Sequence, residues 1–302
     1  MPSVVEKYTD YLDVIDESID NFSSKKKAQK QLAEKYKDTP VEQIPDEALI
    51  VLFSDTPVDS IPEQLRPRIV NAAVALEDLT TLTTDLALWL KNGLATASQW
   101  SDASGNNNHA TQSTSGNQAA VSEGGLDFEE DNSDHYDLAN MITVAAEGGF
   151  CCAWVMDTES ATSNTILSDT NNETIQVQNS SKIRLFTNDP GNITTQLHAA
   201  SGTPFGSAKM LILLNRTAGA SGAWSIYKNG TNISIEADSG GNSSNADAGD
   251  NTNGFTIDTL GSKGGSTNFF DGKLYMVAFW TKSLSATEIT NVNNYLKGVH
   301  GL

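Results

Sequence analysis

The chain has 302 residues and a formal net charge of −19, with 38 acidic against 19 basic side chains. This length is sufficient for one large domain with a smaller unit, or for two ordinary domains. The negative charge disfavours contact with nucleic-acid phosphates, so we expect no nucleic-acid partner.

The two cysteines, Cys151 and Cys152, are adjacent in the sequence. Neighbouring strand residues point to opposite faces, so we expect two buried free thiols rather than a disulfide, as suits a reducing cytoplasm. The first residues show neither the basic nor the apolar segment of a signal peptide, and no apolar run reaches membrane-spanning length. We therefore expect neither a signal peptide nor a membrane partner.

Residues 1–82 have the pattern of a small helical region. Ser3 and Glu6 have the spacing of a capping box, and apolar residues then recur at helical intervals. Farther on, the heptapeptide TPVEQIP returns as TPVDSIP, and a short helical pattern follows each copy. Such short helices need a partner for their apolar faces, and a region of this size buries only a small core. We predict that this region anchors the protein to other proteins or to a second copy of the chain, through Val4, Tyr8, Tyr11, Ile15, Leu49 and Leu52.

From residue 83 the sequence predicts an antiparallel β domain. Short apolar runs alternate with turns that are rich in Gly, Ser, Thr and Asn. Asn229-Gly230 is the dipeptide preferred in a tight hairpin turn. The predicted strands are Leu86–Lys91, Leu126–Phe128, His135–Leu138, Phe150–Met156, Thr165–Leu167, Thr174–Val177, Lys182–Thr187, Ala208–Asn215, Trp224–Lys228, Asn232–Glu236, Phe255–Leu260 and Lys273–Thr281.

The last predicted strand and the residues after it carry the strongest local signals. The strand is apolar on both faces, with Leu274 expected on the same face as Met276, so we expect both faces to be covered. Ser285 and Glu288 then have the spacing of a capping box, and a helix with one apolar stripe follows.

The order of these segments resembles the laminin-G-like (concanavalin A-like) jelly rolls. In that family a strand reading FDG-x-(I/L)-x-x-V leads into a helix that begins LSxxEI, as residues 270–289 do here. Residues 88–110 resemble the family's LWL…W-D-x-S-G-N-G-N-H-A opening, and residues 150–155 and 224–230 resemble two further segments. The resemblance covers residues from about 86 onward. It implies a mainly β fold, with a jelly-roll sandwich of two antiparallel sheets over 83–302 after the helical region 1–82.

Domains of this type with such a polar opening are similar to those of virion structural proteins of tailed bacteriophages. The resemblance implies a non-enzymatic virion protein, either a capsid decoration protein or one associated with the tail or neck. Its helical region would bind other virion proteins, and assembly would take place in the host cytoplasm. The alternative is a lectin module that binds glycans of the host surface.

The stretch from Glu129 to Asp134 nearly spells the E-x-D-x-x-E motif of glycoside hydrolases built on the same jelly roll. Those enzymes need two carboxylates about 5–5.5 Å apart on one face of a strand, with apolar residues between them. Here the intervening residues are polar, which is a loop composition. We therefore expect no hydrolase activity.

The stretch around it, Asp127 to Asp137, is the densest group of oxygen ligands in the chain. Two interpretations stay open: a hydrated acidic loop with no cofactor, or a calcium site with Asp131, Asp134 and Asp137 as ligands.

Two aromatic residues, Trp100 and Phe269, lie beside loops rich in Gly, Ser and Asn. They are the candidates for sugar-stacking platforms. The alternative for both is packing in the core or anchoring of a loop.

Overall fold

The computed structural model describes residues 79–302 except 160–163, 170–172, 188–192, 220–221 and 237–253. Before these it describes residues 31–37, 39–40, 43–44, 48–49, 52 and 65. The chain divides into two compact units, Met1–Asp78 and Leu79–Leu302, so the second unit begins shortly before the predicted boundary at residue 83. In the described part of the chain, no helix combines the length and apolarity needed to cross a membrane.

The described part of the first unit contains a small hydrophobic cluster. Residues 31–36 are helical, and the cluster is formed by Ala33, Ile44, Ala48, Leu49 and Leu65. Leu49 is fully buried and Leu52 packs against the cluster, so Leu49 is already covered within its own unit, contrary to its prediction as a partner-binding residue. The other predicted partner-binding residues, Val4, Tyr8, Tyr11 and Ile15, lie outside the described residues.

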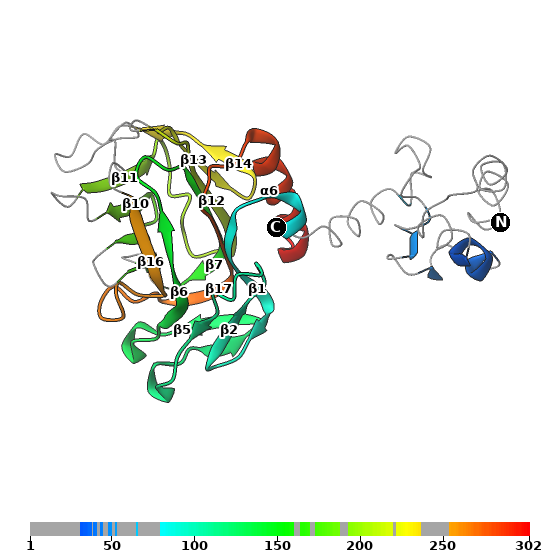
Figure 1. Ribbon diagram of the computed structural model, residues 1–302, viewed down its shortest axis with the longest axis horizontal. Coiled ribbons are helices and arrows are strands. Elements are labelled where there is room, and N and C mark those ends of the chain that lie inside the picture. The colour runs from blue at the N-terminus through cyan, green and yellow to red at the C-terminus, as the bar shows by residue number, and fades with distance from the viewer. Residues whose placement is uncertain are drawn as a thin grey trace. The chain divides into compact units, whose positions relative to one another are not determined.

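The second unit is an antiparallel β-sandwich, which confirms the predicted mainly β fold (Figure 1). One layer, the helix-covered sheet, contains in spatial order β14 (Thr231–Ile233), β13 (Trp224–Lys228), β12 (Met210–Arg216), β7 (Phe150–Thr158), β17 (Gly272–Trp280), β1 (Leu86–Ala95) and β2 (Gln99–Asp102). Two further strands belong to this sheet. β5 (Gly125–Phe128) pairs with the beginning of β17, on the edge of β17 whose end pairs with β1, and β4 (Ala120–Ser122) pairs with β5.

The other layer, the polar-faced sheet, contains β3 (Ala110–Thr111), β6 (Tyr136–Val144), β16 (Phe255–Leu260), β8 (Asn164–Ser168), β9 (Thr174–Asn179), β10 (Lys182–Thr187), β11 (Ile193–Ala199) and β15 (Ile235–Glu236). Pairing of β2 with β3 joins the two layers. The helices among the described residues of the unit are α5 (Leu79–Leu82), the single 3₁₀ turns η3 (Ser115–Asn117) and η4 (Glu130–Asn132), and α6 (Ala286–His300).

The hydrophobic core lies between the two layers. It takes side chains from both sheets, and its centre is a group of aromatic rings around Phe150. The ring of Phe150 stacks on Phe279 with centroids 5.8 Å apart and meets Phe255 and Trp224 edge to face at 4.9 and 5.6 Å. Such edge-to-face pairs add stabilisation beyond the apolar area they bury.

The outer face of the helix-covered sheet is covered as well, as the two-sided apolar pattern of β17 predicts. There α6 buries Ile289, Val292 and Leu296, and its Tyr295 ring meets Trp89 of β1 at 6.2 Å. The predicted assignment of side chains to the two faces was wrong at one point. A register shift between Leu274 and Met276 places Leu274 in the central core with Val277 and Phe279. Such a bulge breaks the strict alternation on which the prediction rested.

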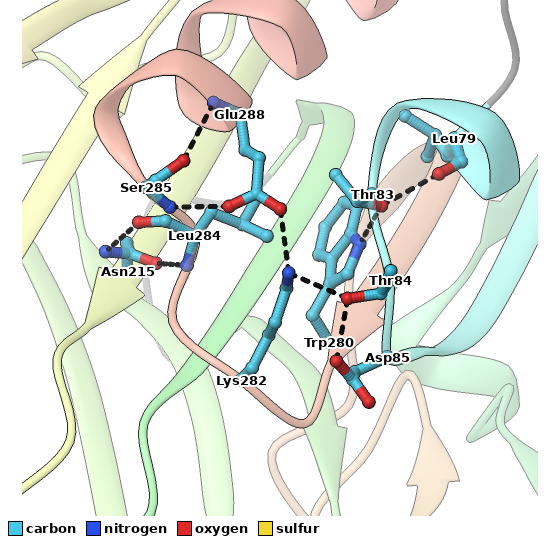
Figure 2. Close-up of polar contacts among 10 residues, drawn as sticks. All are labelled: Leu79, Thr83, Thr84, Asp85, Asn215, Trp280, Lys282, Leu284, Ser285 and Glu288. Atoms are coloured by element: carbon cyan, nitrogen blue, oxygen red, sulfur yellow. Dashed lines mark hydrogen bonds and ion pairs between the residues drawn. The ribbon is translucent and has the colours of Figure 1, made fainter.

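The segment that opens the second unit is bonded to the segment that closes it (Figure 2). The indole Nε1 of Trp280 donates to Thr83 Oγ1 at 2.7 Å, and that hydroxyl donates to the carbonyl of Leu79 at 2.8 Å. The predicted capping box of α6 is confirmed, because Ser285 and Glu288 bond each other's backbone amides. These bonds explain why the unit begins at Leu79 rather than at residue 83.

Candidate functional site

The polar opening of the β unit has a structural role. The Asp102 carboxylate accepts hydrogen bonds from the amides of Trp89, Ser104 and Asn108 at 2.8–2.9 Å and from the Ser104 hydroxyl at 2.8 Å. The Asp102 amide in turn donates to Nδ1 of His109 at 3.0 Å. This group therefore ties the 102–109 loop to β1.

The outer face of the polar-faced sheet carries a row of hydroxyl and carboxylate side chains. Five strands contribute one residue each, and each residue pairs directly with the next: Thr111, Asp137, Thr259, Ser168 and Thr174. Their chain neighbours Tyr136, Leu138, Leu167, Ile175 and Leu260 lie in the core, so the row projects to the opposite side. We call this row of five residues the polar face; Thr111 and Asp137 are its exposed members, whereas the other three are buried.

An aromatic pair lies at one end of the polar face. The rings of His135 and Phe269 have centroids 6.0 Å apart, and both residues are partly exposed. His135 directly precedes β6, whose first residue Tyr136 lies in the core, and Asp137 follows His135 by two residues. Phe269 comes from the loop between β16 and β17, which Ser168 anchors by donating to the Ser262 carbonyl and accepting from the Gly264 amide at 2.9 Å.

The orientation of His135 is fixed from two sides. Its Nδ1 donates to the Ser133 carbonyl at 2.8 Å, and its own carbonyl accepts from the buried amide of Gln112 at 2.9 Å. A Cβ atom at Gly265 would come within 3.2 Å of His135 Nε2, so the absence of a side chain there leaves room for the imidazole. The aromatic pair is therefore a preformed surface.

Two buried side chains in the adjoining strands hold a polar atom without a partner. Thr165 and Gln176 pair across β8 and β9 and are 0% and 2% exposed. In the described part of the chain, neither Thr165 Oγ1 nor Gln176 Nε2 has a hydrogen-bond partner. Gln176 stands between the core residues Ile175 and Val177, so it projects toward the polar face. Buried polar atoms of this kind usually find a partner, and none of the described residues supplies one here.

The structure separates the two predicted sugar-stacking residues. Trp100 is fully buried in the core, and its indole Nε1 donates to the Lys91 carbonyl at 2.9 Å. The prediction of Trp100 as a platform was therefore wrong, because neither face of its ring is accessible. Phe269 keeps the required exposure.

The three predicted calcium ligands do not form one group. Asp131 is exposed on η4, Asp134 is buried with Oδ2 bonded to the Glu129 amide at 2.9 Å, and Asp137 belongs to the exposed row of the polar face. Among the described residues, no three His, Cys, Asp or Glu side chains meet in a way that would hold a metal ion. Asp127, at the start of the same acidic stretch, lies on a third surface, 4.0 Å from Lys273 of β17.

Replacing Asp134 with asparagine is expected to make the β unit more stable at neutral pH. Burial raises the pKa of Asp134 above 3.8, against the lowering effects of the Glu129 amide bond and of His135. A raised pKa in the folded state means that the contribution of Asp134 to stability is present below pH 3.8 and is lost as the pH rises through the folded value. Asparagine keeps an oxygen for the Glu129 amide and carries no charge.

Urea unfolding of the wild type and Asp134→Asn at pH 3.5 and pH 7 would measure this effect, with exposed Asp131→Asn as the control. The advantage of Asp134→Asn should appear at pH 7 and shrink at pH 3.5. A lower stability at pH 7 would contradict the assigned role of burial.

The chain belongs to the concanavalin A-like lectin/glucanases superfamily, whose laminin G-type family model matches residues 130–290. No curated protein sequence matches the chain. Among solved structures, the binding domain of Paraclostridial Mosquitocidal Protein 1 is similar, at 12% identity and a TM-score of 0.50, over 72% of this chain and 53% of that chain. This chain thus matches about half of that solved chain, and the likeness shows the fold alone.

Two further solved structures are more distant. One concerns botulinum neurotoxin type C and its interaction with two ganglioside molecules, at 14% identity and a TM-score of 0.47, over 72% of this chain and 53% of that one. The other is the CBM40 of a Ruminococcus gnavus sialidase bound to α2,3 sialyllactose, at 16% identity and a TM-score of 0.35, over 49% and 83%.

Proposed function

We propose that the β unit is a carbohydrate-binding module and that sugar binds on the polar face beside Phe269. The observation that carries this proposal is the partly exposed Phe269–His135 pair at the end of a row of hydroxyl and carboxylate side chains. Ligand sites combine apolar, often aromatic surface with a few polar groups that fix orientation. Membership of a superfamily named for lectins and glucanases supports the same function.

The polar face offers a sugar both kinds of contact. The ring of Phe269 would pack against the apolar C–H surface of the sugar, while the exposed Thr111 hydroxyl and Asp137 carboxylate would accept hydrogen bonds from its hydroxyl groups. Since His135 and its loop are already held in place, binding would cost little ordering of the protein.

Replacing Phe269 with alanine is expected to reduce glycan affinity at least about tenfold, because the stacking surface is lost while the core is untouched. The matched control is Val121→Ala, which removes a 51% exposed apolar side chain on β4, outside the polar face. A glycan array, run with calcium and with a chelator, identifies the ligand, and titration of the hit gives the two affinities. Absence of any binder, or equal affinity of Phe269→Ala and wild type, would overturn the proposal.

The proposed module binds without cleaving its ligand. The hydrolase-like carboxylates are supported differently from those of an enzyme, because residues 130–132 form a 3₁₀ turn and Asp134 is buried against the amide of Glu129. The carboxylates of this stretch therefore do not lie on one face of a strand, which is the arrangement that retaining hydrolysis requires. We expect Glu129→Gln to leave the activity profile on glycans unchanged, and a hydrolytic activity that this variant loses would contradict the proposal.

A place in a bacteriophage particle stays a prediction from the sequence resemblance, with the glycan-binding module as the part displayed to the host. Mass spectrometry of purified particles tests it, since absence of the protein from virions would remove the prediction. The two functions are compatible, because a virion protein can carry a glycan-binding module.

A further inference from the structure

Resting on the proposed function, we infer that the polar face selects sugars that carry a protonated amine over sugars that carry an acidic group. The ligand class is therefore an oligosaccharide of hexosamine units with free amino groups. The inference rests on the charges that surround the aromatic pair.

Four carboxylates lie on the segments next to the aromatic pair of Phe269 and His135. Asp137 is exposed in the row of the polar face, and Asp258 lies partly buried on the neighbouring strand β16. Glu130 and Asp131 are exposed on the turn that leads into His135. A sugar on the Phe269 ring would therefore meet several negative groups.

Cationic side chains do not compensate for these charges. Lys263 lies in the loop that carries Phe269, so a single cation stands against the four carboxylates named above. Lys182 and Arg184 lie on β10, four strands away from β6, or about 19 Å at the usual strand spacing. That distance is about two Debye lengths at physiological ionic strength, so their charges are screened from the aromatic pair.

The remaining arginine of the described β unit is structural. Arg216 is fully buried, and its guanidinium donates to the carbonyls of Gly148, Thr217 and Gly219 at 2.9–3.2 Å. It therefore provides no bidentate partner for a sugar carboxylate or sulfate, which is the contact that recognition of such groups commonly uses.

Asp137 is the residue assigned to the amine. It is the exposed carboxylate of β6 that follows His135 by two residues, a separation of about 7 Å along an extended chain, or about one sugar ring. An ammonium group donates charge-assisted hydrogen bonds to a carboxylate, and these are stronger than bonds between neutral groups. The same carboxylate repels an anionic substituent at that position.

The test is titration calorimetry of the full chain with one trisaccharide scaffold in three charge states: the glucosamine trimer, its N-acetyl form and its N-sulfo form. We expect the free-amine form to bind at least about tenfold more tightly than the N-acetyl form, and the N-sulfo form to bind more weakly than both. The advantage of the amine should shrink as the salt concentration rises from 20 to about 500 mM.

Asp137→Asn should weaken binding of the free-amine form at least about tenfold more than it weakens binding of the N-acetyl form, so that most of the amine preference is lost. Glu147→Gln is the matched control, because it removes one exposed charge from the turn that follows β6, away from the aromatic pair. If the two variants lose the preference equally, the amine responds to overall charge, and the assignment to Asp137 is wrong.

Failure of this inference can be told apart from failure of the proposed function. Binding of the N-sulfo form as tightly as the amine, or no binding of the amine form, overturns the inference. If the glycan array still returns a neutral ligand whose binding requires Phe269, the proposed function stands. An array without any binder overturns both.

Discussion

Replacing Asp102 with alanine will destabilise the β unit by about 2–4 kcal/mol, because one carboxylate satisfies four donors of the opening loop. The donors include the backbone amide of Trp89 in β1 and that of Asn108, a residue only 7% exposed. Without the carboxylate, these groups must find water or stay unpaired, and the loop that leads from β2 to β3 loses its link to β1.

Urea unfolding monitored by tryptophan fluorescence measures this loss for the β unit alone. All five tryptophans of the chain, Trp89, Trp100, Trp154, Trp224 and Trp280, lie in that unit. Asp102→Asn is the matched control, because its amide keeps one oxygen and the shape of the side chain, and it should recover part of the loss. A shift below about 0.5 kcal/mol for Asp102→Ala would show that the loop holds without its carboxylate.

Replacing Trp280 with alanine will lower the free energy of unfolding of the β unit by about 3–5 kcal/mol, the range for removal of a large aromatic side chain from a packed core. Trp280 is fully buried at the end of β17, on the side covered by α6. Its loss opens a cavity there and also removes the donor to Thr83, one of the bonds that hold the opening segment to the end of the sheet (Figure 2).

Thr83→Val separates the two contributions, since it removes the hydroxyl and leaves the indole packed. We expect this variant to lose about 2 kcal/mol, because the hydroxyl takes part in two hydrogen bonds and each usually contributes about 1 kcal/mol net. Equal losses for Thr83→Val and Trp280→Ala would contradict the assignment of the larger effect to packing.

Local signals in the sequence predicted much of the fold. Alternating apolar runs located most strands, Asn229-Gly230 located the hairpin between β13 and β14, and the spacing of Ser285 and Glu288 located the start of α6. Each of these signals acts over a few residues, so the local structure that it predicts depends little on the rest of the chain. The strand β11 was missed because its sequence, ITTQLHA, is largely polar and lacks a clear alternation.

The candidate site was predicted less completely, because sheet register brings its parts together. Phe269 was recognisable from its polar loop, but nothing local shows that its ring meets His135, which lies more than 130 positions earlier. Trp100 has equally polar neighbours in the sequence, yet its ring is in the core. Separating these two aromatics requires knowledge of which strands cover which loop.

The adjacent thiols of the central strand β7 give the molecule two internal reporters. Both cysteines are free and fully buried, and burial raises the pKa of each thiol. Cys152 lies in the core between the sheets. Cys151 precedes it in β7, and neighbouring strand residues point to opposite faces, so Cys151 faces the side under α6. Its partners in the adjacent strands are Asn215 and Trp280. Alkylation of Cys151 therefore requires α6 to lift, and alkylation of Cys152 requires the two sheets to part. Peptide mapping after timed labelling would give separate opening rates for the two interfaces of one strand.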